Sequence, residues 1–158
     1  MAKFPHYSIA SKYAFIIALS VFVLDQITKL SIKNSIPLHG SIEVLSFLDI
    51  VYFENIGSAF GMFKNLGNAF FIAAAVVACI AVSFLIIKDH QNAIGYSLVL
   101  GGAIGNLSDR IMHGAVIDFL YFHIGKHYWP AFNVADSALT IGVTLLIISV
   151  FFPPRTSS

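Results

Sequence analysis

The sequence predicts a mainly α-helical membrane protein with a small β element outside the membrane. Of its 158 residues, 58% are hydrophobic and only 11% are charged, whereas soluble domains carry about 25% charged residues. The mean hydropathy is +0.83. Four apolar stretches are each about 20 residues long, which is enough for a helix to cross the hydrocarbon of a bilayer. The chain has the length of one domain, and we expect one membrane domain over residues 1–158.

The four spans are expected at about residues 13–32, 69–87, 93–112 and 133–152. Helices are required because lipid offers no partner for backbone N–H and C=O groups. The second span is the plainest, since it contains no charged residue. In the third, Gly101 and Gly105 form a G-x-x-x-G pair, which allows close helix contact.

Two longer connections, about residues 33–68 and 113–132, lie on the same side of the membrane because two spans separate them. Residues 41–55 are rich in β-branched and aromatic side chains, which predicts strands. The segment that follows holds an apolar patch made of Phe60, Met62 and Phe63. The second connection is rich in aromatic residues, which favours a short element lying on the membrane surface. These residues are Phe119, Tyr121, Phe122, Tyr128, Trp129 and Phe132.

The distribution of Lys and Arg favours an orientation with both termini in the cytoplasm. The two sides carry similar numbers of basic residues, but those on the terminal side lie in short segments and are therefore denser. The two long connections would then face the outside.

Asp118 and Asp136 each stand in apolar sequence, where a carboxylate is costly and usually has a function. Asp136 has a structural alternative as the N3 acid of a capping box with Asn133. Asp118 has another, as an ion-pair partner of Arg110 or Lys126. If the two acids meet at the water-facing edge of the bilayer, they can share a proton, so that one activates water and the other polarises a carbonyl.

Other polar residues lie near the ends of the spans. Asp25 and Lys29 have the spacing of a helical ion pair, and Asp109 with Arg110 suggests a similar role, with Arg110 holding loops or a substrate carbonyl. Asn106 is expected to bond backbone or a loop, and Asn55 is either a turn residue or a substrate contact. The fourth span carries one polar stripe, made of Asn133, Asp136, Ser137, Thr140 and Thr144.

Several function classes are disfavoured. The net charge of +1 gives no electrostatic footprint for nucleic acid. There is no H-E-x-x-H motif, and His123 and His127 lack a convincing third ligand for a metal. Two other functions stay open from the residues alone. One is a proton-coupled transporter or channel that uses Asp25, Asp109 and Asp136 as relays, and the other is a non-catalytic assembly subunit.

Five motifs then occur in a fixed order along the chain. They are Asp25-Gln26-Ile27-Thr28-Lys29, Asn55-Ile56-Gly57-Ser58-Ala59-Phe60, Gly105-Asn106-Leu107-Ser108-Asp109-Arg110, Val116-Ile117-Asp118-Phe119 and Phe132-Asn133-Val134-Ala135-Asp136-Ser137. Together they resemble the motifs of lipoprotein signal peptidase, also called signal peptidase II, a family of aspartic proteases of the bacterial inner membrane. The resemblance covers nearly the whole chain.

The resemblance implies a fold, a reaction and a set of site residues. The fold would have four transmembrane helices with both termini cytoplasmic, an extracytoplasmic β-cradle and a short surface helix. Asp118 and Asp136 would be catalytic. The supporting or substrate-binding residues would be Asp25, Lys29, Asn55, Gly57, Asn106, Asp109, Arg110 and Asn133.

The implied substrate is a prolipoprotein whose cysteine carries a diacylglyceryl group, and the cut falls just before that cysteine. The resemblance implies no cofactor and no metal, inhibition by globomycin-type cyclic peptides, and contact with membrane lipid. We also expect a monomeric, multi-pass protein of the bacterial inner membrane, with its active site near the outer face and with no nucleic-acid partner.

Overall fold

The computed structural model describes residues 9–57 and 67–152, which form four helices and one small antiparallel sheet. The predicted apolar patch of Phe60, Met62 and Phe63 lies outside the described residues. The helices are α1 (Ile9–Ser35), α2 (Gly67–Lys88), α3 (Ala93–His113) and α4 (Val134–Phe151). The strands are β1 (Ser41–Leu45), β2 (Leu48–Asn55), β3 (Val116–Ile124) and β4 (His127–Tyr128).

Helix α3 forms the centre of the helical layer and contacts each of the other three helices. The predicted close contact at the G-x-x-x-G pair is confirmed. A Cβ atom on Gly101 would lie 2.6 Å from the carbonyl oxygen of Ala18 on α1, and one on Gly105 would lie 2.6 Å from Asp25 Oδ2. Glycine at these positions therefore lets α1 approach the backbone of α3.

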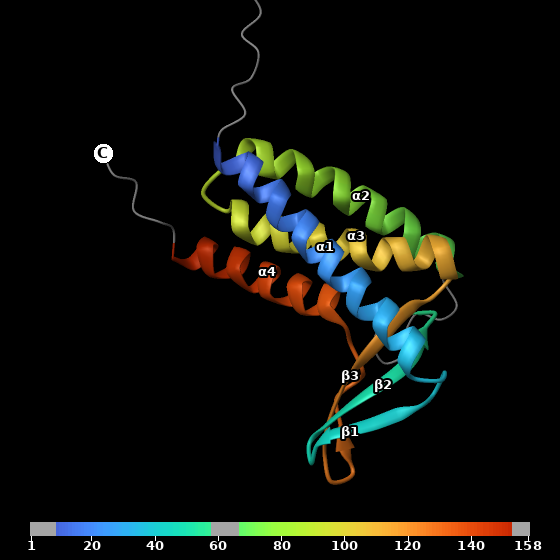
Figure 1. The fold of residues 1–158 in the computed structure, drawn as a ribbon. Coiled ribbons are helices and arrows are strands. Elements are labelled where there is room, and N and C mark those ends of the chain that lie inside the picture. Colours follow the sequence, from blue (N-terminus) through green and yellow to red (C-terminus); the bar gives the residue numbers. More distant parts are fainter. Residues whose placement is uncertain (1–8, 58–66, 153–158) are drawn as a thin grey trace, which may run out of the picture.

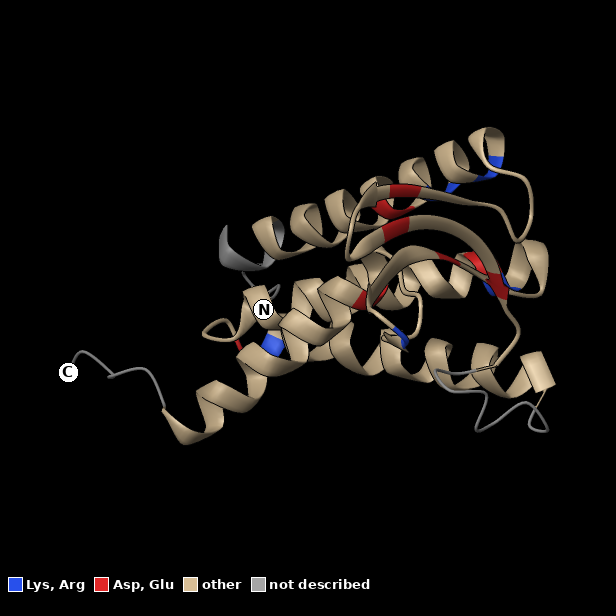
Figure 2. Ribbon diagram, turned by 90° about the horizontal axis from the view of Figure 1, so that it is seen from below, with Lys and Arg blue, Asp and Glu red and all other residues tan. Residues whose placement is uncertain are grey.

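Figure 1 shows that the sheet lies at one end of the helical layer, next to the C-terminal ends of α1 and α3 and the N-terminal end of α4. The start of α1, the end of α4 and the α2–α3 connection lie at the other end. Most of the acidic positions gather where the sheet meets the helices (Figure 2). The polar residues of the motifs are thus concentrated at one end of the molecule.

Three helical segments are long and apolar enough to cross a membrane, namely Tyr13–Ser35, Gly67–Lys88 and Val134–Phe151. Helix α3 has 21 residues, but it carries polar and charged residues near its end and is less apolar. Its role as a fourth span, and the orientation of the chain in the membrane, therefore remain predictions.

The sheet has the strand order β1-β2-β3-β4, and all pairs are antiparallel. The prediction of strands within residues 41–55 is confirmed. In the register between β2 and β3, Phe53 is opposite Asp118 and Asn55 is opposite Val116. This register brings the motif around Asn55 next to the motif around Asp118.

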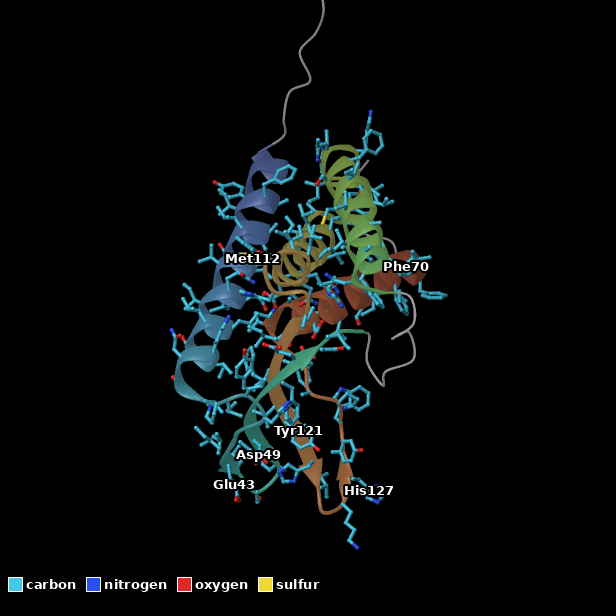
Figure 3. All side chains as sticks on the ribbon, turned by 90° about the vertical axis from the view of Figure 1, so that its right-hand side faces the viewer. Glu43, Asp49, Phe70, Met112, Tyr121 and His127 are labelled. Carbon is cyan, nitrogen blue, oxygen red and sulfur yellow. The ribbon has the colours of Figure 1, made fainter. Side chains whose placement is uncertain are left out.

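The aromatic connection over residues 113–132 forms β3 and β4 rather than a short helix on the membrane surface. The backbone groups of β3 pair with those of β2. If this segment formed a surface helix, β2 would be left as an unpaired edge of the sheet. No short surface helix occurs within residues 9–57 and 67–152. In Figure 3, Glu43, Asp49 and His127 mark the end of the sheet that is farther from the helices.

Candidate active site

Asp118 lies near the start of β3, where that strand leaves the helices, and its side chain is buried. Two side-chain amides donate to its carboxylate: Asn55 to Oδ2 over 3.0 Å and Asn133 to Oδ1 over 2.8 Å. Among the described residues it forms no ion pair, so the alternative of pairing with Arg110 or Lys126 is wrong. Asp118 is therefore held by neutral donors.

Asp136 is the N3 residue of α4, and the predicted capping box is confirmed. The Asn133 side chain accepts from the Asp136 backbone over 2.8 Å, and Asp136 Oδ2 accepts from the Asn133 backbone over 3.3 Å. Its other carboxylate oxygen accepts from the Asn106 amide over 2.7 Å. The cap fixes the position of this carboxylate at the positive end of a helix.

Asn133 connects the two aspartates and has no exposed surface. Its amide nitrogen donates to Asp118, while its amide oxygen and its backbone N–H engage Asp136. The same nitrogen also lies 3.2 Å from Asn106 Oδ1. Asn133 thus connects the start of β3 to the start of α4.

Behind this pair lies a buried ion triad of Asp25, Lys29 and Asp109. The ammonium nitrogen of Lys29 is 2.8 Å from Asp25 Oδ2 and 2.8 Å from Asp109 Oδ2. It also donates to Asn106 Oδ1 over 3.1 Å. The predicted helical pair of Asp25 and Lys29 is confirmed, and Asp109 shares that lysine.

One sequence-based expectation about polar contacts is wrong. Asp109 pairs with Lys29 and not with Arg110, because consecutive residues on a helix do not face each other. The Asn106 side chain accepts from Asn133 in the segment before α4, as expected for a loop contact, and it also bonds Asp136 and Lys29.

Arg110 holds a loop, as one of the alternatives predicted. Its guanidinium donates to the carbonyl oxygen of Gly57 over 3.1 Å and lies 5.1 Å from the ring centroid of Phe71. Asn55 combines a turn contact with a site contact, because its oxygen accepts from the Gly57 N–H over 3.1 Å while its nitrogen donates to Asp118.

A cavity of about 720 Å³ opens over Asp118 and Asp136. Its polar lining includes Asn55, Gly57, Asn106, Arg110, Ser137 and Thr140, and its apolar lining includes Phe71, Ala75, Ala103, Leu139 and Ile141. The polar stripe predicted on the fourth span thus contributes Asp136, Ser137 and Thr140 to the wall. The cavity combines two carboxylates with an apolar groove between helices, the composition typical of a ligand site.

Burial, followed by the nearby charge of Asp136, raises the pKa of Asp118 to about 7. The hydrogen bonds from Asn55 and Asn133 and the charge of Lys29 act in the opposite direction. A carboxyl group with such a pKa keeps its proton in mildly acidic conditions, which is uncommon for an aspartate.

We expect the stability of the folded protein to fall as the pH rises from about 4 to about 7. In this window the folded state retains the Asp118 proton that the unfolded chain has lost, so a rise in pH favours unfolding. Thermal unfolding in detergent across this range should show the decline. In Asp118→Asn the decline should be shallower, and an identical slope in both proteins would contradict the raised pKa.

The structure brings together the residues predicted as catalytic, substrate-binding or supporting. Six line the cavity, namely Asn55, Gly57, Asn106, Arg110, Asp118 and Asp136, while Asn133 and the ion triad lie directly behind it. Sequence reasoning missed Gln26, whose amide contacts Asp25 and Asp109. The only feature of the sequence that pointed to Gln26 was its position next to Asp25 in the first motif. No three His, Cys, Asp or Glu side chains within the described ranges are grouped to hold a metal ion.

The fold and this site define a class: a membrane protein with two carboxylates, one buried and one partly buried, at the mouth of an apolar groove. The model of the family described as Signal peptidase (SPase) II matches residues 17–152. The chain belongs to the signal peptidase II family, and it is therefore a protease that removes signal peptides from prolipoproteins. Membership of this family and the apolar helices fit a protein of the bacterial inner membrane.

Named relatives share most of the chain. A lipoprotein signal peptidase of Thermodesulfovibrio yellowstonii is 49% identical over 128 residues, which cover 80% of this chain and 86% of the relative. A lipoprotein signal peptidase of Alteromonas mediterranea is 40% identical over 147 residues, which cover 89% of this chain and 80% of the relative. A solved bacterial membrane enzyme matches with a TM-score of 0.84 and 33% identity, covering 99% of both chains.

Proposed function

We propose that this protein is an aspartic endopeptidase that cuts diacylglyceryl-modified prolipoproteins just before the lipidated cysteine. The observation that carries the proposal is that Asp118 and Asp136 line one cavity and are joined through Asn133. We call these two residues the dyad. Close carboxylates favour a state in which one is protonated and the other is ionised.

The dyad would activate water without a metal. The ionised carboxylate takes a proton from a water molecule, whose oxygen attacks the carbonyl carbon of the scissile peptide bond. The protonated carboxyl donates to the carbonyl oxygen, giving a neutral tetrahedral intermediate. When the C–N bond breaks, the nitrogen of the cysteine takes a proton from the protonated carboxyl, while the ionised carboxylate takes a hydroxyl proton from the intermediate. The dyad is then restored, and the signal peptide leaves with a free C-terminal carboxyl group.

We assign the resting proton to Asp118 and the resting charge to Asp136. The raised pKa of Asp118 supports the protonated role. Asp136 suits the charge because it lies in the first turn of α4, where the helix dipole stabilises an anion. The titration nonetheless belongs to the pair as a unit.

The cavity suggests how the substrate enters. We propose that α3 is a fourth span, that both termini are cytoplasmic, and that the dyad lies near the outer face. The acyl chains and the signal helix would then stay in lipid, while the scissile bond reaches the dyad along the groove beside Phe71 and Leu139. A globomycin-type inhibitor would occupy the same cavity, and the enzyme would act as a monomer without a cofactor.

The test is cleavage of a prolipoprotein peptide by the purified protein in detergent. Three arms compare the diacylglyceryl-modified peptide, the same peptide with an unmodified cysteine, and the modified peptide with EDTA. We expect cleavage of the modified peptide before the cysteine, at a rate that EDTA does not change. The unmodified peptide should be cut far more slowly, because it lacks the acyl chains that hold the substrate in the lipid beside the groove.

Equal cleavage of both peptides would contradict the lipid requirement. Loss of activity with EDTA, restored by added metal, would contradict the dyad mechanism. Absence of cleavage by a well-folded wild-type protein would contradict the proposed function altogether.

A further inference from the structure

Two buried carboxylates behind the cavity reach the backbone immediately beside the dyad. Asp25 Oδ1 accepts from the N–H of Ala135 over 2.9 Å, and Ala135 directly precedes Asp136. Asp109 Oδ2 accepts from the N–H of Ile117 over 3.1 Å, and Ile117 directly precedes Asp118. Each dyad aspartate therefore follows a residue whose backbone is held by an acid from α1 or α3.

Lys29 and Gln26 connect these two acids to each other. Lys29 bridges them at 2.8 Å on each side. The amide nitrogen of Gln26 makes a second bridge, 3.2 Å from Asp25 Oδ2 and 3.0 Å from Asp109 Oδ1, and it lies 3.4 Å from the carbonyl oxygen of Gly105. The dyad and the two bridges thus form one connected network across α1, α3, β3 and α4.

Lys29 and Gln26 differ in how strongly they constrain the geometry of the two carboxylates that they bridge. The ammonium group of lysine is a compact charge on a flexible stem, so it attracts both acids but constrains their direction weakly. The planar amide of Gln26 donates its two N–H groups at a set angle. It therefore constrains the angle between the two carboxylates as well as the distance.

The close approach of α1 and α3 leaves the Asp25 carboxylate little room to move. A Cβ atom on Gly105 would lie 2.6 Å from Asp25 Oδ2, so this oxygen rests against the backbone of α3. A shift of Asp25 or Asp109 would then be passed through their backbone contacts to Ala135 and Ile117, and so to the dyad.

We propose that Gln26 is a positioning residue that, by bridging Asp25 and Asp109, sets the separation of Asp118 and Asp136. The proposal rests on the proposed function, in which the dyad must hold one water between two carboxyl groups. Gln26 itself lines no part of the cavity and touches no reacting atom. Its effect would be geometric, and a small misplacement of catalytic groups is costly in rate.

The main test uses Gln26→Met, which keeps an unbranched side chain of similar size and removes the amide. We expect kcat to fall by about tenfold, as a sub-ångström displacement of the dyad would cause. KM should stay within about twofold, since the cavity wall is unchanged. The control is Ser31→Ala on the same helix, whose hydroxyl bonds only the carbonyl oxygen of Ile27 in its own helix.

The pH profile separates positioning from general loss of stability. A wider dyad would weaken the repulsion between its carboxylates, so the alkaline limb of kcat in Gln26→Met should move to lower pH. Destabilisation alone would lower the amount of active enzyme, so kcat is calculated from the folded fraction measured at each pH, and destabilisation then leaves this limb in place.

Gln26→Glu provides a second variant with a reversible effect. When ionised, its carboxylate cannot donate and repels both acids, whereas its protonated form can donate to Asp109. The activity of Gln26→Glu relative to wild type should therefore recover as the pH falls, while that of Gln26→Met should not. If Gln26→Met does not fold, this recovery alone decides the question.

Wild-type kcat and an unmoved alkaline limb in folded Gln26→Met would overturn the proposal, as would an activity ratio for Gln26→Glu that does not change with pH. The carboxyl titration of ¹³C-labelled aspartates by NMR gives a readout that needs no substrate. If the wild type cleaves nothing, the proposed function fails, and a shifted dyad titration in Gln26→Met would still support the positioning role. An unshifted titration would reject it.

Discussion

Asp118→Asn should cleave the lipidated peptide at least about a thousandfold more slowly than the wild type, which is the scale expected for loss of a general acid or base. Asparagine keeps the shape of the side chain but only one acceptor oxygen, so it retains the hydrogen bond from Asn55 or the one from Asn133 but not both. It cannot carry the transferable proton. Asp136→Asn should lose a similar factor, since its amide cannot take a proton from water. Initial rates with saturating peptide in detergent measure both.

Asp49→Asn is the matched control. Asp49 is on β2 of the same sheet, where it accepts from Ser41 and lies 3.3 Å from a nitrogen of His123, outside the cavity. The same substitution there should leave the rate near that of the wild type. If a folded Asp118→Asn or Asp136→Asn variant keeps more than about a tenth of the wild-type rate, the dyad mechanism is wrong.

Lys29→Met should destabilise the protein by about 3–5 kcal/mol, the range observed when one partner of a buried ion pair is removed. The substitution leaves two carboxylates, Asp25 and Asp109, which are 0% and 1% exposed, without their shared cation. Either the acids take up protons or the segments separate, and both outcomes cost folding free energy. The loss should appear as a large fall in the melting temperature in detergent.

Two further variants test the cause of this loss. Lys33→Met, one turn further along α1 at an exposed position, should leave the melting temperature almost unchanged. Neutralising both acids in the Lys29→Met background, as Asp25→Asn with Asp109→Asn, should restore part of the stability because no charge is then left unpaired. A melting temperature near that of the wild type in Lys29→Met would show that the triad does not stabilise the fold.

Local sequence patterns predicted most of the secondary structure. All four helices begin and end within a few residues of the expected spans, because each is a long apolar run that must satisfy its own backbone. The strands in residues 41–55 followed from β-branched residues, and the capping box from the spacing of Asn133 and Asp136. These features depend on neighbours within one or two turns.

The aromatic segment over residues 113–132 was harder to predict, because its composition suits both a membrane-surface element and a strand. Its state depends on whether a partner strand is available, and β2 comes from a segment about 60 residues earlier in the chain. Because β2 is available as a partner, residues 116–124 form strand β3 rather than a membrane-surface element.

The sequence by itself determined that this is a membrane protein, which polar residues it keeps in apolar surroundings, and which motifs it shares with signal peptidase II. Only the tertiary structure decided how these residues pair: Asp109 with Lys29, Asn106 with Asp136, and Gln26 between two acids. The physical reason is that each of these pairings includes a contact between two helices, α1 with α3 or α3 with α4. Such partners are chosen by the packing of α3 against α1 and α4, where buried polar groups must find the donors and acceptors that packing brings within reach.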